Sequence, residues 1–270
     1  MFTLGIDIGS TSTKAVILRD GKDIVATSVV DVGAGTSGAR RVLSDIFEKT
    51  GLSLEEMGRT IATGYGRLKF EHSDSQISEL SCHSKGVSFL LPGIHTIIDI
   101  GGQDAKALKL NERGAMVNFV MNEKCAAGTG RFLDVMATVL ETKVSELGRL
   151  SEQATGEINI SSTCTVFAES EVISYLADNI RIPDIIAGIH KSVAKRVSAL
   201  ARRVGLNPNI AMTGGVAQNS GVVKAMEKEI HEKIYVPPMP QLTGALGAAI
   251  LAYEEMEGIL SGPPELTILS

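Results

Sequence analysis

The sequence predicts an α/β protein built from two duplicated halves, each a small sheet decorated with helices. The main observation is an internal repeat, because residues 97–110 align with residues 5–18 when Asp99 is laid on Asp7. Both copies read Ile-Asp-Ile-Gly, then polar turn residues, then Lys-Ala and an aliphatic residue. The offset of 92 residues is too long for a solenoid repeat and fits a duplicated domain. In addition, strand-like runs, glycine turns and helix-period segments alternate along the chain.

The first half begins with a predicted β-hairpin at residues 4–18, where a Gly/Ser/Thr turn separates two β-branched runs. Four more elements are predicted here: a third strand, a helix ended by Gly51, a short strand and a second helix, at residues 23–32, 38–50, 61–66 and 74–91.

The second half repeats the hairpin and then becomes mostly helical. Strands are predicted at residues 116–121, 158–161, 209–216 (running into a diglycine loop) and from Ile234 onward. Helices are predicted at residues 131–140, 165–176, 184–204, 220–230 and 244–257. We expect a first domain at residues 1–95, completed by the helix at 244–257, and a second domain at 96–243 that carries Cys125 and Cys164.

Composition excludes several classes of protein. The 270 residues carry a net charge of −5, which argues against nucleic-acid binding because such proteins normally have a basic excess. The apolar stretches are far too short to span a membrane, and the first residues do not read as a signal peptide. An odd count of three cysteines is a poor disulfide framework. We therefore expect a cytoplasmic protein with no membrane partner.

The turns of the two repeats carry residue types suited to phosphate, since backbone N–H groups and hydroxyls at a hairpin tip can surround an anion. Asp7 and Asp99 precede these turns, where a carboxylate can hold the water shell of Mg²⁺. Gln103 or Asp104 would orient an attacking water. The residues expected to contact phosphate are Gly9, Ser10, Thr11, Ser12, Thr13, Lys14, Gly101, Gly102 and Gln103.

A third glycine loop, Met212-Thr-Gly-Gly-Val216, joins a predicted strand to a helix. By itself this pattern is weak, because strand–Gly–Gly–helix occurs in many α/β folds. As the third element after two phosphate hairpins, it fits the position that binds adenosine. The residues expected to do so are Gly214, Gly215, Val216, Gln218, Asn219 and Gln241.

Together the three loops resemble those of the sugar kinase, chaperone and actin ATPase superfamily over nearly the whole chain. The resemblance implies an actin-like fold of two ribonuclease-H-like domains, with ATP and Mg²⁺ bound in a cleft between them. It also implies catalytic roles for Asp7, Asp99 and Gln103 in hydrolysis. The sequence has no Gly-x-x-x-x-Gly-Lys-Ser/Thr motif of the competing nucleotide-binding fold.

Cys125 and Cys164 each lie in a loop of small residues directly before a predicted helix, a position that favours anionic ligands. Their separation of 39 residues matches no local ligand motif, and by spacing alone burial as small apolar residues is favoured. A four-iron cluster needs four thiolates, which two copies of the chain would supply in pairs. Zinc could use the same four sulfurs.

The segments Glu123-Lys-Cys-Ala-Ala-Gly-Thr-Gly-Arg-Phe-Leu and Ser161-Ser-Thr-Cys-Thr-Val-Phe-Ala-Glu-Ser-Glu are similar to those of the activators (component A) of 2-hydroxyacyl-CoA dehydratases. This resemblance implies a homodimer in which Cys125 and Cys164 of both subunits hold one [4Fe–4S] cluster. It implies ATP-dependent delivery of one electron to a dehydratase (component D), with ferredoxin or flavodoxin as reductant. Cys82 matches a segment that holds no cluster in the family, and we interpret it as structural.

Three alternatives stay open. The chain could be a small-molecule kinase of the sugar type, with Glu169 or Glu171 near a sugar pocket, or a subunit of the benzoyl-CoA reductase type of ATPase. A non-catalytic actin-like assembly protein is the third. Neither the kinase nor the assembly protein gives a reason for two cysteines that precede helices. An anaerobic preparation would separate these two from the activator, because only the activator would be brown.

Overall fold

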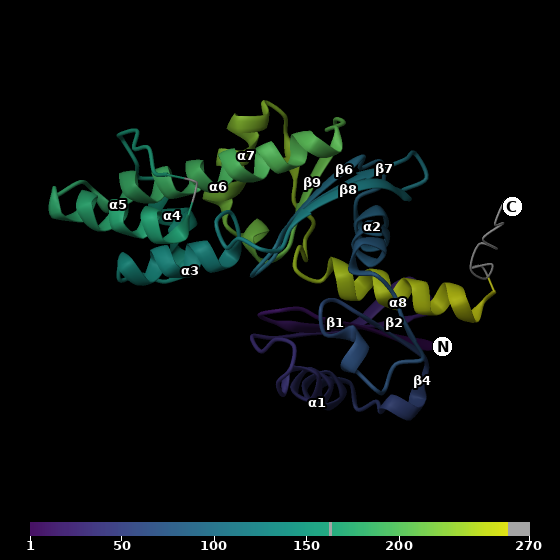
Figure 1. The fold of residues 1–270 in the computed structure, drawn as a ribbon. Helices are drawn as coiled ribbons and strands as arrows, with labels where there is room; N and C mark the ends of the chain where they lie inside the picture. Colours follow the sequence, from purple (N-terminus) through teal and green to yellow (C-terminus); the bar gives the residue numbers. More distant parts are fainter. Residues whose placement is uncertain (162–163, 259–270) are drawn as a thin grey trace, which may run out of the picture. The chain divides into compact units, whose positions relative to one another are not determined.

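The computed structural model of the protein describes residues 1–161 and 164–258 (Figure 1). The chain divides into two compact units. Unit 1 comprises Met1–Gly86 together with described residues 244–258, and unit 2 comprises Val87–Thr243. Two distant parts of the chain therefore build unit 1, whereas unit 2 is one continuous segment.

Unit 1 contains a five-stranded sheet in the order β3-β2-β1-β4-β5. Its strands are β1 (Phe2–Ile8), β2 (Thr13–Arg19), β3 (Asp23–Val30), β4 (Met57–Thr63) and β5 (Ser75–Gln76). The strands β1, β2 and β3 pair antiparallel, and β4 pairs parallel to both β1 and β5. The central strand β1 is buried along nearly its whole length, which explains its run of apolar residues.

Two helices cover this sheet. The helix α1 (Gly38–Thr50) packs Val42 and Ile46 into the core with β1 and β2, and it ends at Gly51, whose φ is 70°. The helix α8 (Thr243–Met256) lies against β1, where a Cβ on Gly5 would come within 2.0 Å of the Ala245 carbonyl oxygen. The glycine therefore sets how closely helix and strand can approach.

The helix α2 (Glu79–Leu90) begins in unit 1 and packs against α8. Its Cys82 is fully buried in a cluster with Ile61 and Ala248. Burial raises the pKa of the Cys82 thiol to about 12, so the residue is present as an uncharged thiol at neutral pH. Cys82 behaves as a small apolar packing residue.

Unit 2 contains a second five-stranded sheet, in the order β10-β9-β6-β7-β8. Its strands are β6 (Thr96–Ile100), β7 (Ala105–Leu110), β8 (Met116–Asn122), β9 (Ile210–Thr213) and β10 (Ile234–Tyr235). The same order is obtained in both units when unit 2 is read from β8 to β10, with two antiparallel hairpin connections followed by two parallel pairings. This repeated topology confirms the predicted α/β fold of two duplicated halves.

The helices of unit 2 are α3 (Gly130–Val139), α4 (Leu147–Ser151), α5 (Thr165–Ala177), α6 (Ile182–Val204) and α7 (Ser220–Ile230). The long helix α6 starts with a proline in its first turn, ends at Gly205 with φ 80°, and packs beside β7, β8 and α7. Within unit 2, Figure 1 shows α3, α4 and α5 grouped around the N-terminal part of α6. None of the helices in the described part of the chain has the length and apolar character needed to cross a membrane.

Two predicted elements differ from the structure. The helix predicted at 74–91 starts only at Glu79. Asp74 and Ile77 instead donate their N–H groups to carbonyl oxygens of β4, and the residues between them form β5 at the edge of the sheet. The strand predicted at 158–161 is wrong. In that segment Ile158 and Ile160 pack against Gly188 of α6, and the Ser161 N–H donates to a carboxylate oxygen of Glu171 at 2.7 Å. Side chains therefore form hydrogen bonds with backbone groups of this segment, which in a strand would pair with a neighbouring strand.

Candidate nucleotide and cysteine sites

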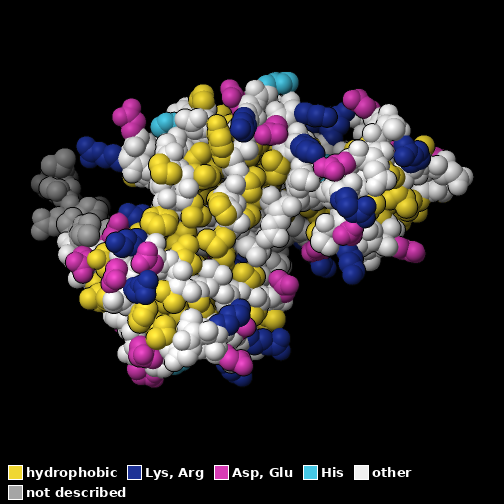
Figure 2. Space-filling view, turned by 180° about the vertical axis from the view of Figure 1, so that it is seen from behind, with side chains coloured by type: hydrophobic (Ala, Val, Ile, Leu, Met, Phe, Trp, Pro, Cys, Tyr) yellow, Lys and Arg dark blue, Asp and Glu magenta, His cyan; other side chains and the backbone are white. Residues whose placement is uncertain are grey.

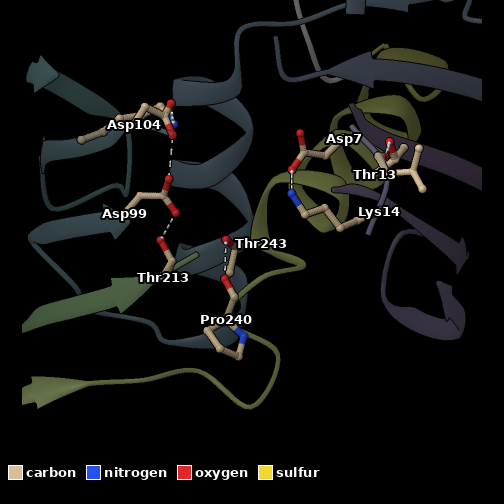
Figure 3. Close-up of polar contacts among 10 residues, drawn as sticks. Asp7, Thr13, Lys14, Asp99, Asp104, Thr213, Pro240 and Thr243 are labelled. Carbon is tan, nitrogen blue, oxygen red and sulfur yellow. Dashed lines mark hydrogen bonds and ion pairs between the residues drawn. The ribbon is translucent and has the colours of Figure 1, made fainter. Parts of the chain in front are cut away.

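The first of the two hairpins predicted to contact phosphate, here called the phosphate hairpins, joins β1 to β2 in unit 1. Asp7 and Lys14 lie opposite each other across the two strands, and Lys14 Nζ is 3.3 Å from Asp7 Oδ2 (Figure 3). Asp7 is only 5% exposed, and Gly9 closes the turn by donating its N–H to the Ser12 carbonyl oxygen at 3.1 Å. A buried carboxylate therefore lies at the base of a tip rich in hydroxyl groups, and its charge is balanced by one lysine.

A glycine after β4 leaves room for this carboxylate. Gly64 has a φ of 84°, in the left-handed region that glycine favours, and a Cβ there would lie 2.3 Å from Asp7 Oδ1. Its neighbour Thr63 pairs with Asp7 across the parallel strands. The loop that follows β4 is thus part of the first candidate site.

The second phosphate hairpin joins β6 to β7 in unit 2 and repeats this geometry. Lys106 lies opposite Asp99 across the strands, with Lys106 Nζ 3.3 Å from Asp99 Oδ2. Thr213 Oγ1 donates to Asp99 Oδ1 at 2.8 Å (Figure 3). Asp104 also reaches Lys106, at 2.6 Å, so two carboxylates surround one buried lysine. This excess of negative charge suits a hydrated divalent cation.

The third loop follows β9, as predicted. Gly214 has a φ of 85°, and a Cβ on it would lie 2.2 Å from the Ile100 carbonyl oxygen and 3.1 Å from Asp99 Oδ1. The Gly214 N–H donates to the carbonyl oxygen of Pro240 at 2.9 Å, which brings the segment containing Gln241 to the same loop. A short 3₁₀ turn, Gly215–Gln218, then leads into α7.

Within unit 2 the structure thus brings together Asp99, the second hairpin and the Gly214 loop. Unit 1 brings Asp7 together with residues 9–14. Sequence reasoning missed the Thr63-Gly64 pair and left Lys106 out of the expected site residues. Both were visible as a weak signal, because Thr63-Gly64 and Thr213-Gly214 repeat at the ends of equivalent strands and Lys106 aligns with Lys14.

Of the two remaining cysteines, both in unit 2, Cys164 lies at the beginning of a helix and Cys125 lies in the loop that precedes one. Cys164 is the N-cap residue of α5, with an extended backbone and a carbonyl oxygen that accepts the Ala168 N–H at 3.0 Å. Cys125 lies between β8 and α3, and both cysteines are half-buried. Ser162 and Thr163, which belong to the segment compared above, lie outside the described residues.

A buried histidine supports the N-terminus of α7. Asn219 caps this helix, since its Oδ1 accepts the N–H groups of Gly221 and Val222 at 3.0 and 3.2 Å. Its Nδ2 therefore donates to His190 Nε2 at 3.2 Å, and the neutral ring carries its proton on Nδ1. His190 is 2% exposed, and among the described residues its Nδ1 has no hydrogen-bond partner. Burial lowers the pKa of His190 to about 4.

His190 predicts a specific loss of stability in mild acid. Because its folded pKa of about 4 lies below the usual 6.5, the unfolded chain takes up the proton first as pH falls. The free energy of unfolding should fall by about 2 kcal/mol on going from about pH 7.5 to about pH 5. In a His190→Gln variant this histidine-dependent part should disappear. Urea unfolding at both pH values checks this, and the same pH dependence in both proteins would contradict it.

Comparison with known proteins agrees with this arrangement. Residues 4–252 match the model of the BadF/BadG/BcrA/BcrD ATPase family. The chain is 59% identical over 255 residues to the 2-hydroxyisocaproyl-CoA dehydratase activator of Clostridioides difficile, which covers 94% of this chain and 96% of that protein. It is 57% identical over 256 residues to the (R)-2-hydroxyglutaryl-CoA dehydratase activating ATPase of Acidaminococcus fermentans, covering 94% and 98% respectively.

Among solved structures, the activator of the 2-hydroxyisocaproyl-CoA dehydratase from Clostridium difficile with bound ADPNP superposes with a TM-score of 0.93. The two chains are 57% identical, and the match covers 97% of this chain and 99% of the other. The likeness confirms the predicted actin-like ATPase fold. This chain belongs to the BadF/BadG/BcrA/BcrD ATPase family.

Proposed function

We propose that this protein is an ATP-dependent activator of a 2-hydroxyacyl-CoA dehydratase, which delivers single electrons to that enzyme. The observation that carries the proposal is its identity of 57–59%, over at least 94% of the chain, to proteins named as such activators. Two buried Asp–Lys pairs at equivalent hairpins support the ATPase part of the proposal.

Each hairpin would contribute to nucleotide binding in the same way. The backbone and hydroxyl groups of residues 9–13 and 101–103 would contact phosphate oxygens. Asp7 and Asp99 would hold water molecules of a bound Mg²⁺, which itself neutralises phosphate charge. Gln103 is exposed at the second tip, where it would orient the attacking water. The Gly214–Asn219 segment and Gln241 would contact adenosine.

The chemistry of the cysteines fits a [4Fe–4S] cluster shared by two copies of the chain. Of the three cysteines, Cys82 is fully buried, whereas Cys125 and Cys164 are half-buried. Two thiolates from each of two subunits complete the four that such a cluster needs. When bound, the cluster supplies storage for one electron at low potential. The N-terminal N–H groups of α5 would stabilise negative charge beside Cys164.

The surface next to Cys164 fits a homodimer. Val166 and Phe167, in the first turn of α5, are each 65% exposed, and Ile173 two turns later is 52% exposed. Figure 2 shows apolar side chains among charged ones at the end of unit 2 that carries α5. These exposed apolar residues directly follow Cys164, the proposed cluster ligand. They suit a contact between two copies of the chain, because a two-fold axis brings the same patch of both copies together. The further partners are a dehydratase (component D) and ferredoxin or flavodoxin as the reductant.

The test is to measure the iron content, the acid-labile sulfide content and the native mass of the anaerobically purified protein. We expect about four irons and four sulfides per dimer. Cys125→Ser and Cys164→Ser should each lose the brown colour and most of the iron, whereas Cys82→Ser is the matched control that should keep both. A colourless, iron-free dimer or monomer of the unaltered chain would contradict the electron-transfer part, even if the protein binds ATP.

A further inference from the structure

The N-terminus of α3 is capped by the second phosphate hairpin. The Gly130 N–H donates to the Gly101 carbonyl oxygen at 2.9 Å, and the Arg131 N–H donates to the Gly102 carbonyl oxygen at 2.8 Å. The first N–H groups of a helix have no partner within the helix and are normally satisfied by a side chain. Here the N-cap residue Thr129 forms no side-chain cap, so the hairpin carbonyls take that role.

A glycine at the first position of the helix allows this contact at its observed distance. A Cβ on Gly130 would lie 3.2 Å from the Gly101 carbonyl oxygen and 3.3 Å from Gly102 Cα. Both neighbours are backbone atoms, which cannot swing aside as a side chain would. An alanine at this position would therefore push the hairpin and the start of α3 apart by a few tenths of an ångström.

The segment between α3 and Cys125 is tied together internally. The Ala126 carbonyl oxygen accepts both the N–H and the Oγ1 hydroxyl of Thr129, at 3.0 and 2.7 Å. The Cys125 carbonyl oxygen accepts from Asn122 Nδ2 at 3.1 Å. Gly128 has a φ of 86° and lies against the Arg196 side chain of α6. A Cβ on Gly128 would lie 3.2 Å from Arg196 Cδ. A displacement of Gly130 would therefore reach Cys125 without being absorbed by a loose loop.

Cys164 is anchored differently. Ser161, three residues before it, donates its N–H to Glu171 of α5 at 2.7 Å and accepts the Ser192 hydroxyl of α6 at 3.3 Å. These two hydrogen bonds of Ser161 run to α5 and α6, whereas the segment after Cys125 is hydrogen-bonded to the second hairpin through Gly130 and Arg131.

We propose that Gly130 is a positioning residue that couples the phosphate hairpin at Gly101–Gly102 to Cys125, so that the nucleotide state of the hairpin sets the position of this one cysteine. The inference rests on the proposed function, in which the hairpin contacts nucleotide and Cys125 is a cluster ligand. It makes the two cysteines unequal: Cys125 responds to nucleotide through α3, and Cys164 does not depend on that route.

The experiment uses the full chain freed of any cluster, and measures the alkylation rate of each cysteine by peptide mass spectrometry with and without Mg²⁺-ADPNP. In the unaltered chain, nucleotide should change the rate at Cys125 about fivefold or more. In Gly130→Ala the response should fall below about twofold, with any response of Cys164 retained. Arg131→Ala is the matched control, because it removes an exposed side chain and keeps the backbone donor.

A second variant keeps the proposal testable if Gly130→Ala does not fold. Thr129→Val keeps the shape of a fully buried side chain and removes only the hydroxyl bond to Ala126, so it should weaken the Cys125 response partially. Calorimetry of ADPNP binding separates the two hypotheses. An unaltered chain that binds no ADPNP overturns the proposed function and this inference with it. A chain that binds ADPNP while Cys125 reacts at the same rate, or a Gly130→Ala variant with the full response, overturns this inference alone.

Discussion

Asp99→Asn is expected to lower kcat for ATP hydrolysis by about 100-fold to 1,000-fold. The substitution keeps the size of the side chain and an acceptor for the Thr213 hydroxyl, which lies 2.8 Å from Asp99 Oδ1. It removes the negative charge that would orient the water shell of Mg²⁺. Lys106 keeps its second carboxylate, Asp104, at 2.6 Å, so no lysine is left buried without a counter-charge. Asp7→Asn should have an effect of the same order.

Phosphate release at saturating Mg²⁺-ATP measures this effect, with urea unfolding to confirm that the variants are folded. Asp184→Asn is the matched control: its carboxylate is also buried in unit 2, and accepts the N–H groups of Thr155 and Gly156 at 2.6 and 2.8 Å. These backbone hydrogen bonds lower the pKa of Asp184. The control should lose stability and keep kcat. Unchanged turnover in both Asp7→Asn and Asp99→Asn would remove the two carboxylates from the proposed mechanism.

Gly247→Ala should destabilise unit 1 by about 3 kcal/mol or more. A Cβ on Gly247 of α8 would lie 1.8 Å from the Cys82 carbonyl oxygen and 2.9 Å from the Gly86 nitrogen, both in the backbone of α2. Alanine favours a helix interior over glycine by about 1 kcal/mol. Forcing two packed helices apart costs more than that gain, because α2 and α8 are both held in the core of unit 1.

The unfolding midpoint in urea measures this effect, and Gly58→Ala provides the comparison. A Cβ on Gly58 would come 2.7 Å from Met256 Cε, the end of a flexible side chain that can move away. This control should stay within about 1 kcal/mol of the unaltered protein. Equal stability of the two variants would mean that the close packing of α2 on α8 is not a constraint.

The fold could be predicted because its strongest signal is local. Each Ile-Asp-Ile-Gly run, together with the Lys-Ala that follows it, predicts a strand, a turn and a second antiparallel strand within about 14 residues. The two hairpins indeed have matching registers, with Asp7 opposite Lys14 and Asp99 opposite Lys106. The edge strands of the sheets were harder to predict. The strand β5 has only two residues, too few to show an alternating pattern that would distinguish it from the helix that follows.

The candidate sites were predictable only in part, for a physical reason. Residues that are expected to act through their side chains, such as Asp99, have a signature in the sequence. The link between Gly130 and Gly101 is a backbone hydrogen bond between distant segments, and a backbone donor leaves no side-chain signature in the sequence. The segment at 158–161 misled prediction because Ile158 and Ile160 alternate as in a strand, whereas they pack on a helix. Which residues pack there depends on tertiary structure.

The two-part construction of unit 1 has a consequence for how the protein is made. A ribosome delivers β1 before the whole of unit 2, whereas the helix that covers it, α8, is synthesised after unit 2. Unit 2 is continuous and can fold while the nascent chain is still growing. Until α8 is synthesised, β1, the buried strand that carries Asp7, has one apolar face uncovered. Chaperone binding during translation should therefore concentrate on β1, and production should be most sensitive to changes in the rate at which the segment between β1 and α8 is synthesised.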